Sequence, residues 1–282
     1  MMMSAVTSLS ELPAADGEVR ASVGAGGPFG DIYQRQPLRL LRPRVDAGEP
    51  QTGILVNTAG GIVGGDRHRI EIDCVAKGDA LLVGQAAEKV YRTSGPTATI
   101  EVQLTANNGA RLEWLPQGTI LFDAARLTRQ TTLRRAKSAR ILAGEILVLG
   151  RIGMAETVQT GALFDRWRIE DCGRLAWLDA LHLDGDIAHL GAVAAGLNGA
   201  RTLATVLYVA DDAAARLDEA RAMLGESTTD LRVGATVVGN VLICRWLGKE
   251  PHFLREAVGR FWCRFRAATL GRKPNLPVLW HH

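Results

Sequence analysis

The stretch IEVQLTANNGARLEWL occupies residues 100–115 and places a turn signal between two strand-like segments. Ile100, Val102 and Leu104 alternate with polar residues, and this period of two is typical of a half-buried β-strand. Asn107-Asn108-Gly109 then supplies residues that tolerate positive φ, after which a second apolar segment begins. The pattern predicts a β-hairpin.

Similar segments occur on both sides of this stretch. Ile70, Ile72 and Cys74 alternate with charged residues, and a second hairpin is predicted where residues 167–177 turn at Cys172-Gly173. Further strand-like segments cover residues 141–149, 202–209 and 235–246. We therefore expect a mainly β fold, with a large antiparallel or β-helix-like sheet body and a few helices, the main ones towards the C-terminus.

Two helices are expected late in the chain. The first begins at Asp211 or Asp212, which are suitable N-caps, and ends at Gly225. The second follows Pro251 and ends at Gly271. Its apolar stripe, opposite a basic face, predicts a helix packed on the sheet body. The stripe consists of Phe253, Leu254, Ala257, Val258, Phe261, Trp262 and Phe265.

The two ends of the chain carry separate expectations. Residues 1–30 are rich in Ala, Gly and Ser without a sustained period, so we expect a mobile lead-in there and a single domain over residues 31–282. The tail at residues 275–280 is expected to face a partner protein, because Trp and Arg are common anchors of interfaces.

Composition excludes several classes of protein. With 47% hydrophobic residues and a net charge of +3, the chain is not intrinsically disordered. Basic and acidic residues are interleaved, which argues against a nucleic-acid partner. The four cysteines lie far apart, so neither a disulfide framework nor a closed zinc site is indicated. No apolar run approaches the ~18 residues of a membrane-spanning helix, and we expect a cytoplasmic protein with no membrane partner.

The glycine-rich stretch at residues 57–66, NTAGGIVGGD, allows two interpretations. Paired glycines permit positive φ and close backbone approach, which suits tight bends between packed strands. A phosphate-binding loop is the alternative, but the stretch lacks the Gly-Lys-Ser/Thr ending of a P-loop. No G-x-S-x-G elbow occurs in the chain, which argues against a nucleophilic hydrolase.

Four acids lie in otherwise apolar segments: Asp66, Glu88, Asp123 and Glu156. Half-buried carboxylates must be paired, hydrogen-bonded or facing water. Pairing with the many arginines is one explanation. A polar passage through the β body is the other, because carboxylates are weak, exchangeable ligands for a divalent ion.

Seven segments together resemble the UreD/UreH family of urease accessory proteins, in the order of that family. They are residues 36–43 (QPLRLLRP), 57–66 (NTAGGIVGGD), 85–92 (QAAEKVYR), 112–117 (LEWLPQ), 120–123 (ILFD), 145–151 (EILVLGR) and 165–168 (DRWR). One departure stands out, because Gly118 occupies the position where the family usually has Glu.

The resemblance implies a mostly β scaffold that is not an enzyme. The resemblance implies that the chain binds the urease apoprotein during nickel insertion. It also implies two further partners, a UreF-type helical accessory protein and a UreG-type GTPase. The resemblance thus implies no tightly bound cofactor, transient Ni²⁺, and GTP used by the partner GTPase. It also implies that nickel passes through an internal polar tunnel, to which motif matching assigns Asp66, Glu88, Asp123 and Glu156.

Two other functions remain open at this point. The chain could be a stand-alone nickel-binding or storage module, which tight stoichiometric binding by the isolated chain would favour. It could also be an enzyme that uses the Gly60–Asp66 loop on a phosphorylated ligand.

Overall fold

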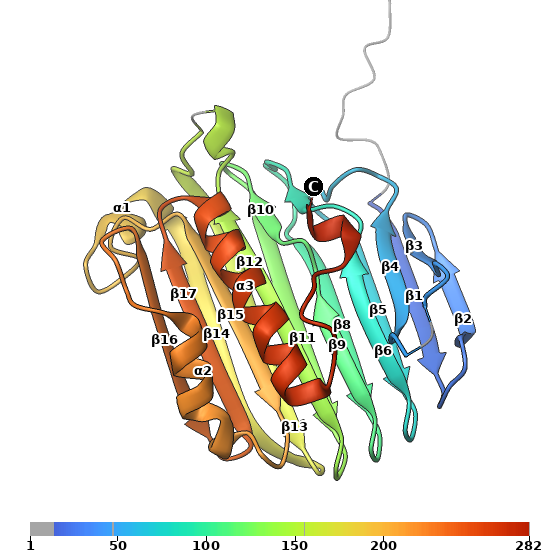
Figure 1. Cartoon of the computed structure of the whole chain (residues 1–282). Helices are drawn as coiled ribbons and strands as arrows, with labels where there is room; N and C mark the ends of the chain where they lie inside the picture. Colours follow the sequence, from blue (N-terminus) through green and yellow to red (C-terminus); the bar gives the residue numbers. More distant parts are fainter. Residues whose placement is uncertain (1–13, 47, 155, 282) are drawn as a thin grey trace, which may run out of the picture.

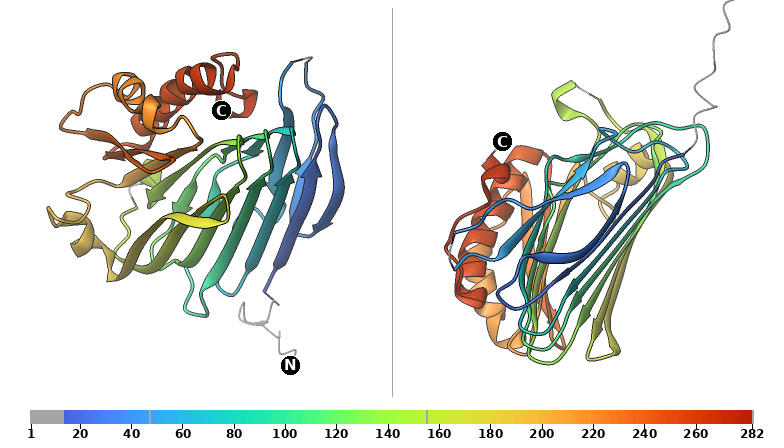
Figure 2. Two further views of the ribbon diagram at one scale, coloured as in Figure 1. Left: turned by 90° about the horizontal axis from the view of Figure 1, so that it is seen from below. Right: turned by 90° about the vertical axis from the view of Figure 1, so that its right-hand side faces the viewer.

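The computed structural model describes residues 14–46, 48–154 and 156–281, which form two β-sheets packed face to face (Figure 1, Figure 2). The seven-stranded sheet has the order β14 (Arg174–Asp186), β13 (Thr160–Asp171), β11 (Arg126–Arg135), β8 (Ala98–Ala106), β5 (Arg67–Cys74), β1 (Asp16–Val23) and β2 (Phe29–Arg35). The main core lies between the sheets and contains buried residues of both, such as Ile72 and Leu82.

The second sheet has ten strands and carries the larger helices on its outer face. Its main path is β16 (Leu231–Val238), β17 (Val241–Gly248), β15 (Thr202–Val209), β12 (Arg140–Leu149), β9 (Arg111–Leu115), β6 (Asp79–Gly84), β4 (Gln51–Asn57) and β3 (Leu38–Leu41). Two short strands, β10 (Thr119–Leu121) and β7 (Glu88–Val90), pair beside β12.

The chain alternates between the two sheets, as in a β-solenoid. Strands β1, β5, β8, β11 and β13 pair in parallel in one sheet, and β4, β6, β9 and β12 do so in the other. Antiparallel pairs occur at the ends of both sheets. The expected mainly β, β-helix-like body is confirmed, whereas antiparallel pairing is confined to its ends.

The hairpin predicted at residues 100–115 is wrong. β8 belongs to the seven-stranded sheet and β9 to the ten-stranded sheet, so the turn is an arch that crosses the core. Its backbone bonds to the preceding arch, with Asn107 N–H donating to Cys74 O (2.9 Å) and Lys77 N–H donating to Asn108 O (2.9 Å). Turn residues that tolerate positive φ serve an arch as well as a hairpin, so the local sequence does not distinguish them.

The second predicted hairpin is confirmed by the antiparallel pair β13–β14. Cys172 (φ 50°) and Gly173 (φ 76°) form its two-residue turn, with both residues at the positive φ that such tight hairpins need.

The mobile lead-in predicted for residues 1–30 is wrong from residue 16 onward, and residues 1–13 lie outside the described part of the chain. Asp16–Val23 forms β1, which pairs in parallel with β5. Two of its inward positions carry the small residues Gly17 and Ala21, which weakens the apolar signal of Val19 and Val23. Gly17 packs so closely that a Cβ there would come within 2.9 Å of Leu38 Cγ.

Both predicted helices are present, but the expected start of the first at Asp211 or Asp212 is wrong, because neither residue caps a helix. α2 (Leu217–Leu224) follows a 3₁₀ turn, η3 (Ala214–Arg216), and ends at Gly225. α3 (Pro251–Leu270) ends at Gly271 in the left-handed conformation and lies across the outer face of the ten-stranded sheet (Figure 1). The remaining helical elements are α1 (Ile187–Ala192), η2 (Ile152–Met154) and η4 (Val278–His281). No helix in the described ranges is long and apolar enough to span a membrane.

One end of α3 is fixed by a buried ion pair. Glu113 of β9 is fully buried and accepts from Arg266 Nε (2.8 Å), Arg266 Nη2 (2.9 Å) and Trp262 Nε1 (3.2 Å). The expected core stripe is buried except for Phe253, which is 56% exposed.

Trp280 of the C-terminal tail is part of the core, so the expected partner-facing tail is wrong for this residue. That side chain is 5% exposed and packs beside Gly259 of α3. Gln117 Nε2 donates to Leu279 O (2.7 Å), and Arg255 Nη2 donates to Trp280 O (3.0 Å). Asn275 and Val278 are exposed, Val278 at 75%.

This packing predicts different outcomes for two tail substitutions. Trp280→Ala should lower the free energy of unfolding by about 3 kcal/mol, because it leaves a cavity against α3. Val278→Ala, the matched control, should change it by less than about 0.5 kcal/mol. Urea denaturation of both variants measures the difference. Equal stabilities would contradict the assignment of Trp280 to the core.

Candidate functional site

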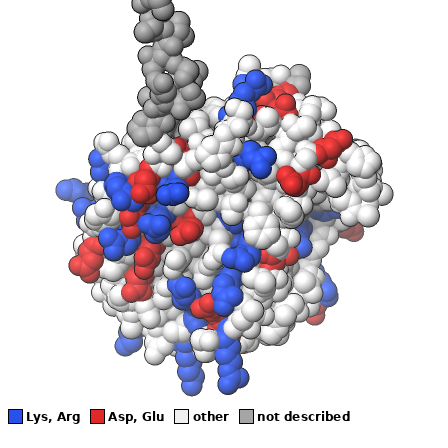
Figure 3. All heavy atoms as spheres, turned by 180° about the vertical axis from the view of Figure 1, so that it is seen from behind, with Lys and Arg blue, Asp and Glu red and all other residues white. Residues whose placement is uncertain are grey.

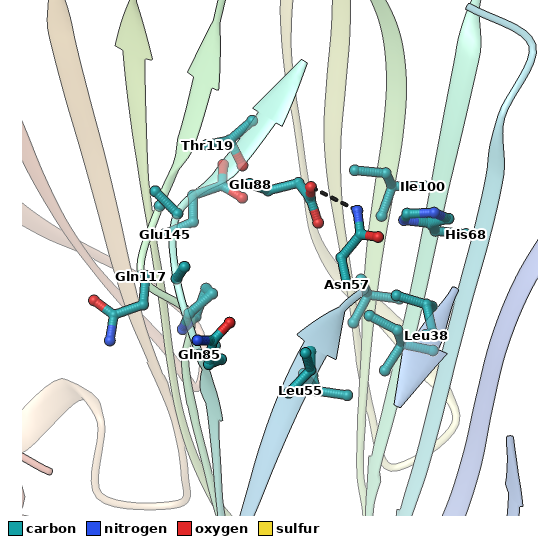
Figure 4. Close-up of a pocket in the computed structure, with 18 of the residues that line it drawn as sticks. Leu38, Leu55, Asn57, His68, Gln85, Glu88, Ile100, Gln117, Thr119 and Glu145 are labelled. Atoms are coloured by element: carbon teal, nitrogen blue, oxygen red, sulfur yellow. Dashed lines mark hydrogen bonds between the residues drawn. The ribbon is translucent and has the colours of Figure 1, made fainter. Parts of the chain in front are cut away.

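A cavity of about 200 Å³ lies between the two sheets and is called here the inner cavity (Figure 4). Its wall combines apolar side chains, among them Leu38, Leu55, Ile100 and Trp114, with a polar set. The polar set consists of Asn57, His68, Gln85, Glu88, Lys89, Gln117, Thr119, Arg129, Thr131 and Glu145. The inner cavity is therefore lined by apolar, polar and charged side chains together.

Strand register explains how these residues meet. His68, Ile100, Arg129 and Asp165 are successive Cα partners across β5, β8, β11 and β13, and all four side chains are buried. They form one line across the seven-stranded sheet, called here the inward row. Parallel in-register pairing places residues of like orientation side by side, so the polar members of the inward row face the same interior.

Glu88 is the one predicted site residue that lines the inner cavity. Its Oε1 accepts a hydrogen bond from Asn57 Nδ2 (2.9 Å), which holds the carboxyl against the glycine-rich stretch (Figure 4). Burial raises the pKa of Glu88, while the Asn57 bond acts in the opposite direction. A cation nearby would favour the ionised form of this carboxyl.

His68 also lines the inner cavity and was missed by the sequence interpretation. It is 3% exposed, and its Nε2 has no hydrogen-bond partner in the described part of the chain. Burial lowers the pKa of His68 despite the nearby Asp66 and Asp16 carboxylates. A neutral imidazole nitrogen is a suitable ligand for first-row divalent metals. The sequence pattern could have identified it, because His68 lies two and four residues before Ile70 and Ile72 and therefore faces the same side of the strand.

Arg129, Asp165 and Glu145 form a buried charged cluster beside the inner cavity. Arg129 Nε donates to Asp165 Oδ1 (2.9 Å), and Arg129 Nη2 lies 2.8 Å from Glu145 Oε2. Burial raises the pKa of Glu145 well above its ordinary value, whereas Arg129 outweighs burial at Asp165 and lowers the pKa of that carboxyl. Asp165 is thus the main counter-charge of Arg129. These three residues were also missed as site candidates.

The other three predicted site residues lie outside the lining of the inner cavity. Asp66 accepts from the backbone N–H groups of Ala15 (2.7 Å) and Val63 (2.9 Å). Asp123 accepts from the backbone N–H groups that follow Val158, at Gln159 (2.7 Å) and Thr160 (3.1 Å).

Glu156 is held by Arg151, whose backbone N–H (3.0 Å) and side chain both donate to its carboxylate. Its Oε2 accepts from Arg151 Nε (2.9 Å), and this bond lowers the pKa of the Glu156 carboxyl. Across the ranges that the structure describes, no three His, Cys, Asp or Glu side chains are grouped as a metal site. The four predicted acids therefore do not form one ligand set.

The glycine-rich stretch packs tightly against β7. A Cβ at Gly61 would come within 2.9 Å of Lys89 O, and Ile62 N–H donates to the same oxygen (2.7 Å). This packing agrees with the interpretation of tight bends between strands.

The outer face of the seven-stranded sheet carries mixed charge. Figure 3 shows Lys and Arg interspersed with Asp and Glu on the side opposite α3. Ion pairs on this face include Arg69–Glu101 (3.5 Å) and Arg134–Glu170 (3.2 Å). The basic residues on this face are therefore not massed in one stripe.

The fold and the inner cavity define a two-sheet, β-solenoid-like protein with a polar, charge-lined interior. The chain belongs to the UreD family of urease accessory proteins, because the family model described as "UreD urease accessory protein" matches residues 18–281. This confirms the resemblance that the seven sequence segments indicated.

Similar proteins match this chain over most of their length. Proteins named "Urease accessory protein UreD" from Magnetococcus marinus and Azorhizobium caulinodans are 40% and 41% identical, covering 88% and 92% of this chain and 87% and 95% of their own. A protein of the same name from Rhodopseudomonas palustris is 43% identical and covers 94% of this chain and 93% of its own.

The contacts of Asp66 predict a structural role for its carboxylate. Asp66→Ala removes the two carboxylate oxygens that accept from the backbone N–H groups of Ala15 and Val63. It should lower the free energy of unfolding by about 2 kcal/mol. Glu71→Ala, an exposed position on β5, is the control and should have an effect below about 0.5 kcal/mol. Denaturant unfolding compares the variants, and an unchanged Asp66→Ala midpoint would refute this role.

Proposed function

We propose that this chain is a maturation chaperone that is needed to insert nickel into the urease apoprotein. Membership of the UreD family supports the urease-related role. The observation that carries the nickel step is the inner cavity, which is lined by Glu88 and by His68, whose Nε2 has no partner among the described residues. Carboxylate and imidazole are suitable donors for a divalent first-row ion.

The donor set fits passage better than storage. Tight sites for such ions need three or four ligands held together, and no such group occurs among the described residues. No cysteine of the described chain lines the inner cavity, so soft thiolate ligands are missing from its wall. A site of this kind exchanges its ion readily, which favours a relay over the stand-alone nickel-binding or storage module.

The phosphate-ligand enzyme is the weaker alternative. The Gly60–Asp66 loop packs against β7, and the Asp66 carboxylate would repel a phosphate. The chain itself is therefore proposed to have no catalytic residues. GTP hydrolysis is assigned to a UreG-type partner, and a UreF-type helical protein completes the proposed cytoplasmic complex with the urease apoprotein.

Within this proposal, Glu88 is the acid that contacts nickel. Asp66, Asp123 and Glu156 are given no direct contact, because backbone N–H groups or Arg151 already occupy their carboxylates.

The test of the function is urease activity and nickel content in a host that expresses the urease structural and accessory genes, with and without this chain. Activity and nickel that vanish without the chain and return with it would support the maturation role. Fully loaded, active urease in its absence would overturn it.

A single substitution tests the contact assigned to Glu88. Glu88→Gln keeps an acceptor for Asn57 but removes the negative charge, so nickel per urease should fall by roughly tenfold. Glu101→Gln, an exposed position on β8, should leave the nickel content unchanged. Metal analysis of purified urease gives the readout, and co-purification of the accessory proteins checks that the complex assembles. Normal loading by the Glu88 variant would exclude this contact.

A further inference from the structure

The strand β14 forms one edge of the seven-stranded sheet and is 13 residues long. Antiparallel pairing with β13 uses one side of its backbone. On the other side, alternate residues of an edge strand direct their N–H and C=O groups away from the sheet. Among the described residues, no group outside the β13–β14 pair bonds to the backbone of residues 174–184. This side of β14 can therefore accept a further strand.

The other edge strands of the two main sheets are short, irregular or capped. β3 has four residues, and β2 pairs with β1 across a register shift. On β16, Ser227 Oγ accepts from Val233 N–H (3.0 Å), and Arg221 Nε donates to Ala235 O (3.4 Å). Such features hinder the addition of a strand. In contrast, β14 pairs with β13 without a register shift from Trp177 onward, and its outer side has no such cap within the described ranges.

The side chains of β14 are exposed and apolar in the first half and the middle of the strand. Leu175 and Leu178 are 52% and 50% exposed, and Ala180 is exposed as well. The two ends carry opposite charges, because Arg174 and Asp186 are both exposed. A strand with opposite charges at its two ends is complementary to an antiparallel copy of itself.

One register satisfies this complementarity. When two β14 strands align antiparallel about Ala180, Arg174 of each copy lies opposite Asp186 of the other, and Leu178 lies opposite His182. Moving the centre by one residue towards the start of the strand would place Asp179 opposite its own copy, and like charges directly opposite each other are destabilising. Moving the centre by one residue in the other direction would carry the residue opposite Arg174 beyond the end of the strand, so the charge pairing would be lost.

We propose that β14 is a homodimer interface, in which two copies of this chain pair their β14 strands antiparallel about Ala180. The backbone groups on the outer side of each strand then bond to the other copy, and the two seven-stranded sheets become one continuous sheet. The interface is isologous, since the same strand contributes on both sides. It is separate from the inner cavity and does not depend on the proposed nickel function.

The first measurement is the mass of the purified full chain by sedimentation velocity over a range of concentrations. Hydrogen exchange of its amides is measured at the lowest and the highest concentration. Dimer formation should slow exchange of alternate β14 amides by roughly tenfold and leave the capped edge strand β16 unchanged. A chain that is monomeric throughout, or a dimer without protection in β14, would overturn the proposal.

Charge substitutions at Ala180 test the register. Ala180→Lys and Ala180→Glu each place like charges opposite each other, so each should weaken self-association by roughly fivefold. An equimolar mixture of the two variants should restore association, because Lys then lies opposite Glu. This rescue requires that residue 180 of one copy lies against residue 180 of the other. Thr236→Lys, at an exposed position on β16, is the matched control and should leave association unchanged.

The remaining outcomes distinguish a second copy from another occupant of the edge. A dimeric original chain without rescue in the mixture would contradict pairing about Ala180. If Ala180→Lys leaves the mass unchanged but abolishes co-purification with urease, the edge binds a different protein and the homodimer is overturned. The melting temperature of each variant checks its folding. If neither Ala180 variant folds, the exchange of β14 amides in the original chain decides.

Discussion

In-register parallel pairing of the strands is the constraint on which the rest of this structure depends. Each arch carries the chain from one sheet to the other, and its turn bonds to the arch before it. Residues of equal phase in successive strands therefore stand side by side, as His68, Ile100, Arg129 and Asp165 do in the inward row. Polar residues at this phase cannot reach solvent, so they need partners across the interior or a cavity between them.

The ten-stranded sheet has a buried carboxylate on each of its faces. Glu113 of β9 faces outward and pairs with Arg266, which fixes α3 and hence the tail that packs on it. Glu145 of β12 faces inward and contacts Arg129 of the other sheet. Removing Arg266 or Arg129 would leave a buried carboxylate without its main counter-charge. The first pair joins a helix to a sheet, whereas the second joins the two sheets beside the inner cavity.

The sequence predicts elements better than it predicts their pairing. The period of two in β5 and β8, the boundaries of α3 and the turn at Cys172-Gly173 follow from local chemistry, and the structure confirms them. The arch after β8 and the strand β1 were predicted wrongly, because the same turn residues serve hairpins and arches and because small inward residues give little hydrophobic signal. Glu88 could be found from its motif. His68, Arg129 and Glu145 could not be identified as lining residues from the sequence, because they lie on three different strands that only the folded structure brings together.

Gly118 links the rim of the inner cavity to the family pattern. The family pattern places Glu at this position, but here the residue has φ +118°, and a Cβ would lie 3.2 Å from Ile146 O. This backbone conformation therefore disfavours any side chain, a carboxylate included. Gly118 O accepts from Glu88 N–H (2.8 Å), so the same conformation positions the strand that carries Glu88. With position 118 lacking a carboxylate, Glu88 and Glu145 are the two acids that line the inner cavity in the described part of the chain, one on β7 and one on β12.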